Sequence, residues 1–198
     1  MNEKPIAAGK SSFSYVDKEL LKEVLFPLEG LVILDAACGA GNYTLALARW
    51  AGVHSQIYAL DLWDDGIFEL RQQLDNAGFS HVQAHVVDIS QGTGLAPESV
   101  DLCLAATFLH DFVSLGKAEG ALEALHRSLK PGGRLVAIEF RKIPPPPGPP
   151  ESLRLSFKEL ETLVTPLGFS LKGEHSLGEI LYALIFEKIP EELSATDS

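Results

Sequence analysis

The stretch Leu31–Ala48, LVILDAACGAGNYTLALA, decides the fold of this chain. It begins with an unbroken apolar run, Leu31–Leu34, which is followed by Asp35 and then by a loop of small residues, Ala36–Gly41. Asn42 opens a segment whose apolar residues have helical spacing. The order is therefore a buried strand, a tight loop and a helix N-terminus. This order places backbone N–H groups and the positive end of a helix against whatever the loop binds.

Strands and helices alternate along the rest of the chain. The apolar runs that predict further strands are 57–60, 82–87, 100–106 and 134–140, with a terminal hairpin over 169–187. Ser14 and Asp17 predict a capping box that opens a helix before Pro27, and Ser156 with Glu159 predicts a second one. Short connections and continuous apolar strands indicate an open, mostly parallel α/β sheet. Such sheets bind ligands at the carboxyl ends of their strands.

Length and composition limit the class of protein. At 198 residues we expect one domain, residues 1–198, with tails at 1–12 and 190–198 and a helix over 13–26 that forms a lid. The net charge of −11 argues against a surface that follows nucleic-acid phosphates. No run reaches the ~18 apolar residues of a membrane span. Cys38 and Cys103 lack metal or disulfide spacing, so we expect a cytoplasmic protein without a bound metal.

The glycine pattern of the loop separates several nucleotide-binding classes. A dinucleotide loop requires G-x-G-x-x-G, and Thr44 stands where its third glycine belongs. A phosphate-binding loop of the Walker type requires a lysine after the second glycine, and none follows Gly41. Asp35, at the mouth of the loop, disfavours a pyrophosphate and favours a ligand with an ammonium or sulfonium centre.

At this point the chain resembles the class I S-adenosylmethionine-dependent methyltransferases, in the branch that includes quinone-biosynthesis enzymes. The segment Val32–Gly41 is similar to the first motif of that family, with Ala37 in place of its first glycine. Leu129–Gly133, LKPGG, resembles the turn that precedes strand five in the family. The resemblance covers about residues 14–187. It implies a Rossmann-like, doubly wound sheet of seven strands in the order 3-2-1-4-5-7-6, with strand seven antiparallel.

The same resemblance implies S-adenosyl-L-methionine as the cofactor and suggests residues that bind it. Asp61 would hold the ribose hydroxyls, because a carboxylate can accept hydrogen bonds from both hydroxyls of a diol. Asp88 would accept from the adenine amine, with the Ile89 N–H beside the ring. The expected cofactor-binding residues are Asp35, Ala37, Gly39, Gly41, Asp61, Leu62, Asp88, Ile89 and Ala106.

His110 is the candidate catalytic residue. It follows strand four, where the methyl acceptor approaches in this family, and an ordinary histidine pKa near 6.5 suits a general base. The alternative is that His110 and Asp111 cap the next helix or orient each other. Glu139 and Arg141 have two interpretations: they line the acceptor pocket, or they pair with each other at the surface. The proline-rich segment 143–150 is expected to be an extended surface loop, either a pocket rim or a rigid connector.

The expected reaction is transfer of the sulfonium methyl group to a small-molecule acceptor by an SN2 displacement. The segment Ala105–Phe108 lacks the Asn/Asp-Pro-Pro-aromatic motif of nucleobase amine methylation. The acceptor, the attacked atom and the oligomeric state are left open. One alternative is a non-catalytic protein that binds the cofactor or a partner. Another is an NAD-linked dehydrogenase, which Thr44 disfavours.

Overall fold

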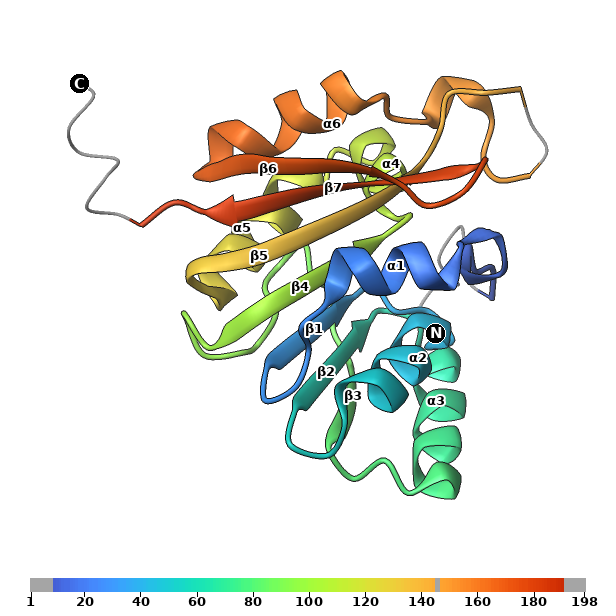
Figure 1. Ribbon diagram of the computed structural model, residues 1–198, viewed down its shortest axis with the longest axis vertical. Helices are drawn as coiled ribbons and strands as arrows, with labels where there is room; N and C mark the ends of the chain where they lie inside the picture. The colour runs from blue at the N-terminus through green and yellow to red at the C-terminus, as the bar shows by residue number, and fades with distance from the viewer. Residues whose placement is uncertain (1–8, 145–146, 191–198) are drawn as a thin grey trace.

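The computed structural model describes residues 9–144 and 147–190 and is built on a seven-stranded sheet (Figure 1). The strand order is β3-β2-β1-β4-β5-β7-β6. β7 pairs antiparallel with β5 and with β6, and the other neighbouring strands are parallel. The strands are β1 (Val32–Ala36), β2 (Gln56–Asp61), β3 (Val82–Val86), β4 (Val100–Ala106), β5 (Leu129–Phe140), β6 (Phe169–Ser176) and β7 (Leu181–Lys188). The predicted strand order and the antiparallel seventh strand are therefore confirmed.

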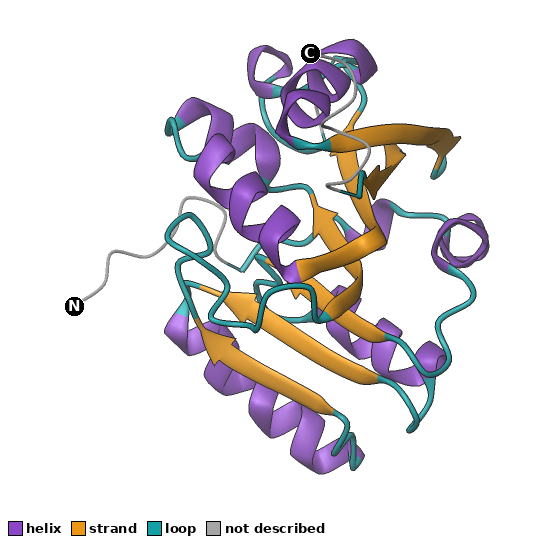
Figure 2. Cartoon of the chain, turned by 90° about the vertical axis from the view of Figure 1, so that its left-hand side faces the viewer, coloured by secondary structure: helices purple, strands orange, loops and turns teal. Residues whose placement is uncertain are grey.

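Helices cover both faces of this sheet (Figures 1 and 2). The α-helices are α1 (Lys18–Leu25), α2 (Asn42–Ala51), α3 (Asp64–Ala77), α4 (Leu109–Ser114), α5 (Ala118–Ser128) and α6 (Phe157–Val164). Three short 3-10 turns, η1 (Phe13–Tyr15), η2 (Glu151–Leu153) and η3 (Thr165–Leu167), complete the described elements. α1, α2 and α3 share one apolar cluster with the sheet, and α4, α5 and α6 share a second cluster with it. The fold is a three-layer α/β sandwich.

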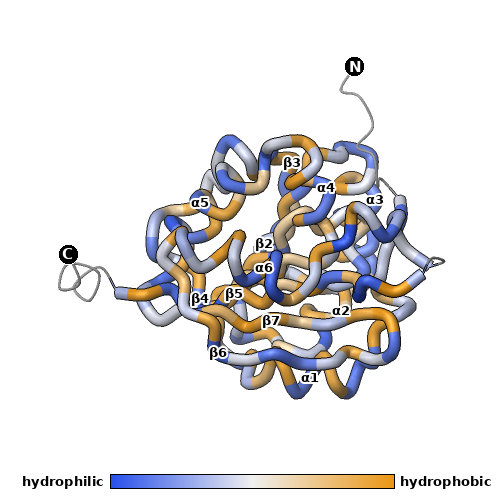
Figure 3. The backbone as a smooth tube through the Cα atoms, turned by 90° about the horizontal axis from the view of Figure 1, so that it is seen from above, coloured by the Kyte–Doolittle hydropathy of each residue, from blue (hydrophilic) through white to orange (hydrophobic). Residues whose placement is uncertain are grey.

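The central strands are apolar throughout because both of their faces are buried. In β1, Ile33 belongs to the first cluster and Leu34 to the second, and in β4 Leu102 and Cys103 divide in the same way. All four side chains are 0 % exposed. Apolar segments accordingly run through the middle of the molecule in Figure 3, with hydrophilic segments toward its outside. A parallel sheet covered on both faces produces this pattern.

The two predicted capping boxes have different outcomes. Ser156 caps α6 as predicted, with the reciprocal contact to Glu159. The box at Ser14 was wrong, because Ser14 lies inside η1 and Asp17 is the N-cap of α1. The Asp17 carboxylate accepts from the backbone N–H groups of Glu19 and Leu20. An aspartate is as good an N-cap as a serine, so the spacing alone did not separate the two starts.

The helix α4 and the start of β5 also differ from the prediction. The helix α4 was not predicted, since its six residues are too few to show a clear apolar period. Strand β5 begins at Leu129 rather than at Arg134, and it includes the Pro-Gly-Gly turn that was expected to precede it. The register between β4 and β5 shifts between Val100 and Leu102, which accommodates the proline in the strand.

The packed part of the chain begins before residue 13, inside the segment 1–12 that was predicted to be a tail. Ser12, the last residue of that tail, is buried. In the expected lid segment 13–26, α1 packs its residues Leu21 and Leu25 into the core. Residues 1–8 and 191–198, which make up most of the two predicted tails, lie outside the described part of the chain, as do 145 and 146 in the proline-rich loop. Within the described part, no helix is long and apolar enough to cross a membrane.

Candidate functional site

The loop after β1 has an unusual backbone. Ala37, Gly39 and Gly41 all have positive φ angles, of 53°, 57° and 79°. This left-handed conformation is accessible to glycine without strain and is costly for other residues. Ala37, the departure from the family's glycine, therefore adopts a glycine conformation. A Cβ built on Gly39 would meet no atom within 4 Å among the described residues, so open space lies beside the loop there.

Asp61, at the carboxyl end of β2, holds this loop in place. Its carboxylate accepts the backbone N–H of Gly39 at 2.7 Å and that of Trp63 at 2.8 Å. The Cys38 N–H donates to the Leu60 carbonyl at 3.0 Å, a second tie between the loop and β2. Burial raises the pKa of Asp61, and the backbone N–H donors oppose that rise. Asp61 is half-buried, so its carboxylate is partly accessible at the end of β2.

Asp35 is a buried carboxyl whose side-chain hydrogen-bond partner among the described residues is Thr44. It is 1 % exposed and accepts the hydroxyl of Thr44 at 2.5 Å. Burial raises its pKa from 3.8 to about 7, the Thr44 hydrogen bond opposes the rise, and the charge of Asp61 adds to it. Burial and the charges of Asp35 and Asp61 likewise raise the pKa of the Cys38 thiol. Cys38 is therefore a protonated thiol, which argues against a nucleophilic role.

Asp35 and Asp61 are two acidic groups that interact electrostatically. Within residues 9–144 and 147–190, no lysine or arginine forms an ion pair with either carboxylate. Two interacting carboxyls in a partly buried site are destabilised in their charged forms, and a cation bound near them favours those forms. The donor set therefore fits a ligand that carries a positive charge and a diol, as the sulfonium cofactor does.

Replacement of Asp35 by asparagine should stabilise the chain in the absence of ligand. A carboxyl whose pKa is raised on folding costs stability as the pH rises from its unfolded value, 3.8, through its folded value, about 7. Asparagine keeps an acceptor for Thr44 and removes the charge. We expect a gain of about 2 kcal/mol at pH 8 and none near pH 4, measured by urea unfolding at both pH values.

The matched control for this experiment is Asp75→Asn, at an exposed position of α3. It should change the free energy of unfolding by less than about 0.5 kcal/mol at either pH. A gain for Asp35→Asn that does not depend on pH would contradict the role given to the Asp35 charge.

The remaining predicted cofactor residues lie at the same edge of the sheet. Asp88 follows β3, and the Val87 N–H donates to the Asp61 carbonyl at 2.8 Å, which joins the two strand ends. Burial tends to raise the pKa of Asp88, but hydrogen bonds from Ser90 and the ammonium of Lys117 lower it overall, so its carboxylate is charged. The side chain of Ile89 is buried; the remaining two residues, Leu62 and Ala106, are half-buried.

His110 lies in the first turn of α4, which follows β4, the neighbour of β1 in the sheet. Its Nδ1 is 2.8 Å from a carboxylate oxygen of Glu139, the penultimate residue of β5. His110 is 4 % exposed and Glu139 is 0 % exposed. Burial lowers the pKa of His110, and the hydrogen bond and charge of Glu139 more than reverse this, so that the pKa is raised. Glu139 therefore pairs with His110 and not, as one interpretation had it, with Arg141 at the surface.

A chain of hydroxyl groups crosses the same edge and was not predicted. Ser12 Oγ lies 3.0 Å from the Tyr43 hydroxyl and 2.9 Å from Thr107 Oγ1. Thr107 has a φ of 54°, a strained value for a β-branched residue. Tyr15, in the expected lid segment, is 41 % exposed. No motif links three hydroxyls so distant in sequence, so only the fold could reveal this contact.

Arg154 is a further residue that the sequence did not predict. It is 1 % exposed, and its guanidinium donates to the carbonyls of Arg141, Ile143, Pro147 and Pro149 at 2.7–3.0 Å. It also lies over the ring of Phe140, 5.5 Å from the ring centre. The ring of Phe140 in turn makes an edge contact with that of His110. Arg154 thus fastens the described parts of the proline-rich loop beside His110.

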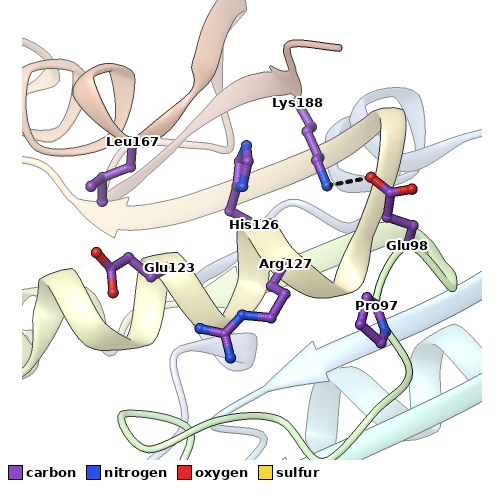
Figure 4. Close-up of a pocket in the computed structure, with 7 residues that line it drawn as sticks. All are labelled: Pro97, Glu98, Glu123, His126, Arg127, Leu167 and Lys188. Atoms are coloured by element: carbon purple, nitrogen blue, oxygen red, sulfur yellow. Dashed lines mark hydrogen bonds and ion pairs between the residues drawn. The ribbon is translucent and has the colours of Figure 1, made fainter. Parts of the chain in front are cut away.

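A separate pocket lies at the opposite, amino edge of the sheet. Its cavity volume is about 670 Å³, and its lining residues are Pro97, Glu98, Glu123, His126, Arg127, Leu167 and Lys188 (Figure 4). Lys188 is buried and bonds to Glu98 at 3.2 Å and to the Leu129 carbonyl at 2.9 Å. These contacts join the end of β7 to the segment before β4. The pocket has mixed charge and shares no lining residue with the carboxyl edge.

Comparison with known proteins agrees with this geometry. A protein-family model described as a methyltransferase domain matches residues 33–133. The chain is 29 % identical over 117 residues to a ubiquinone/menaquinone biosynthesis C-methyltransferase of Hydrogenovibrio crunogenus, and 30 % identical over 113 residues to one of Klebsiella pneumoniae. These alignments cover 59 % and 57 % of this chain and 45 % and 44 % of the relatives, so the chain spans less than half of their length.

Solved structures share the fold. A SAM-dependent methyltransferase of Aquifex aeolicus superposes with a TM-score of 0.81 over 90 % of this chain and 93 % of that one, at 24 % identity. The [4+2]-cyclase SpnF superposes with a TM-score of 0.72 over 86 % of this chain and 79 % of that one, at 19 % identity. Because one neighbour is described as a cyclase, the fold alone does not determine the reaction.

Proposed function

The chain belongs to the class I S-adenosylmethionine-dependent methyltransferase family, and we propose that it transfers a methyl group from S-adenosyl-L-methionine to a small-molecule acceptor. The observation that carries this proposal is the pair of interacting carboxyls, Asp35 and Asp61, beside a loop with three left-handed residues and open space at Gly39. This arrangement suits a ligand that combines a cation with a ribose.

The cofactor would be held by residues from three strand ends. Asp61 would accept the ribose hydroxyls with the lone pairs that Gly39 and Trp63 leave free, and Asp35 would favour the positive charge. Asp88 and Ile89 would face the adenine, with Leu62 beside it. Ala37, Gly41 and Ala106 would let the backbone approach the ligand closely. When bound, the cofactor supplies a methyl group on a positively charged sulfur, which is already activated for displacement.

We assign the proton-accepting role to His110. The methyl donor needs no activation by the protein, so a base is required only where the acceptor must lose a proton. His110 lies beyond the carboxyl end of β4, next to the strand that carries the cofactor loop. The buried ring of Phe140 makes an edge contact with the His110 ring and would exclude water from that side. Such exclusion favours alignment of acceptor and donor over hydrolysis.

Net charge supports a small-molecule acceptor over a nucleic acid. The net charge of −11 and the absence of a basic stripe in the sequence disfavour a nucleic acid, which requires a cationic surface. The curated relatives are C-methyltransferases of quinone biosynthesis, so small aromatic or enolic acceptors are the first to examine. A cytoplasmic location is part of this proposal.

Methyl transfer can be tested directly. The full chain is incubated with methyl-labelled S-adenosyl-L-methionine and a panel of phenols, enols and amines, and label in the acceptor is measured. Transfer to a small molecule supports the proposal. Binding of the cofactor without transfer to any member of a broad panel would favour a non-catalytic binding protein instead.

The ribose role of Asp61 gives a separate prediction. Asp61→Asn keeps one acceptor for the loop but removes the charge and an acceptor position. Hydrogen bonds to charged groups contribute about 1.5–3 kcal/mol, so we expect S-adenosylhomocysteine affinity to fall at least about tenfold by calorimetric titration. Asp64→Asn, an exposed change three residues away, should leave the affinity unchanged. Equal affinities for the two variants would remove Asp61 from the binding site.

A further inference from the structure

We infer that Glu139 is a positioning residue that fixes the tautomer of His110, so that Nε2 is the atom that takes the proton of the acceptor. This inference rests on the proposed methyl transfer with His110 as its base. It adds three points to that proposal. Glu139 orients the histidine, Nε2 is the nitrogen that reacts, and the acceptor must be a group that can release a proton.

The hydrogen bonds of the Glu139 carboxylate carry the first step. One oxygen is 2.8 Å from His110 Nδ1 and 3.3 Å from the backbone N of Phe140; the other accepts the backbone N–H of His110 at 3.2 Å. A carboxylate in this position only accepts, so Nδ1 must carry a proton. In the neutral ring, Nε2 is then the nitrogen with a free lone pair.

The surroundings of Nε2 carry the second step. Among the described residues Nε2 makes no hydrogen bond, and Oδ1 of Asp111 lies 3.7 Å away, which is beyond hydrogen-bond distance. The structure therefore holds one ring nitrogen in a short hydrogen bond and leaves the other for a different partner. A base whose second nitrogen is held by a carboxylate is the arrangement expected of an oriented general base.

Folding alone does not account for the pair. A buried His–Glu pair must offset the loss of hydration of both groups, and apolar residues of similar volume often stabilise a core equally well. The charged groups that act on His110 come from three elements: Glu139 on β5 and Asp111 on α4 favour its cation, and Arg154, after η2, opposes it. The charge of Glu139 also raises the pKa of two tyrosines, Tyr43 on α2 and Tyr182 on β7.

The implied step balances as a displacement. The acceptor atom forms a bond to the methyl carbon as the carbon–sulfur bond breaks, and the electron pair of that bond stays on sulfur. The acceptor proton moves to Nε2, and the imidazolium so formed is stabilised by the Glu139 carboxylate. Hydroxyl and carbon-acid acceptors have such a proton to give, and a tertiary amine does not.

The test is nitrogen-15 NMR of the histidine rings in the full chain, titrated with pH and without any acceptor. In the unmodified protein, neutral His110 should have its proton on Nδ1, and its pKa should lie above 6.5. In Glu139→Gln, an isosteric change that removes the charge and keeps one of the two acceptor oxygens, the pKa should fall below 6.5. Without the Glu139 charge, burial and the positive charge of Arg154 lower the pKa of His110 by more than the charge of Asp111 raises it.

Two further variants make the result specific. Asp111→Asn removes a charge from the same neighbourhood without touching Nδ1, so the Nδ1 tautomer should persist. Glu139→Asp restores the charge and should return the pKa part of the way. A proton on Nε2 in the unmodified protein, or an unchanged pKa in folded Glu139→Gln, would overturn the inference. These spectra are recorded without an acceptor, so they do not depend on whether the chain transfers a methyl group. The proposed methyl transfer and the role of Glu139 can therefore be contradicted independently of each other.

Discussion

Gly41→Ala should destabilise the chain by about 2–5 kcal/mol, a large part of the 5–15 kcal/mol typical of a domain. Gly41 has a φ of 79°, and a Cβ on it would lie 2.3 Å from Cδ1 of Leu70, which is fully buried in α3. The left-handed backbone costs about 1–2 kcal/mol for alanine, and the overpacked contact costs about 1–3 kcal/mol more. Urea unfolding measures the loss as a lower midpoint at an unchanged slope.

Gly39→Ala is the matched control, because it shares the left-handed backbone and lacks the contact. Its Cβ would enter open space, so only the backbone cost should appear in stability. That same space is the proposed cofactor position, so Gly39→Ala should weaken S-adenosylhomocysteine binding more than it weakens the fold. Equal destabilisation by the two substitutions would show that the contact with Leu70 does not add to the loss of stability in Gly41→Ala.

His110→Asn should lower turnover by about 10²–10⁴-fold, the usual contribution of a general base. The asparagine amide can still donate to Glu139 from near the position of Nδ1, so the buried carboxylate keeps a partner and the fold is preserved. The substitution removes Nε2 and with it the proposed proton acceptor. Turnover is measured with an acceptor identified by methyl transfer, and cofactor affinity by calorimetry should stay within about twofold.

The control for this substitution is His54→Asn, at an exposed loop position away from the sheet edge. It should leave both turnover and affinity unchanged. If His110→Asn retained full turnover on an acceptor that loses a proton, His110 would not be the base. If its affinity for S-adenosylhomocysteine collapsed as well, the histidine would be acting through the fold of the cofactor site.

The sheet could be predicted from sequence because its signals are local. Apolar runs that end in Asp35 and Asp61 mark parallel strands buried on both faces, and small residues mark the loop after β1. Helix starts were less certain. Ser14 and Asp17 are both acceptable N-caps, and the choice between them depends on where Leu21 packs in the core. Short elements such as α4 carry too few residues for a period to show.

The cofactor side of the candidate site was easier to predict than the acceptor side. Asp35, Gly39 and Asp61 are close to one another because each follows or ends a neighbouring strand. The partners of His110 depend on contacts over long stretches of sequence: Glu139 is 29 residues away, and Arg154 reaches the site through backbone carbonyls. A buried glutamate near the end of β5, among apolar neighbours, was the available signal, since a carboxylate there requires a partner.

The central claim is that the loop between β1 and α2 binds S-adenosyl-L-methionine. Calorimetric titration of the full chain with S-adenosylhomocysteine, and in parallel with NAD, tests it most directly. We predict saturable one-to-one binding of S-adenosylhomocysteine, weakened in Asp61→Asn, and no comparable binding of NAD. Tight binding of NAD with no heat from S-adenosylhomocysteine would contradict the account.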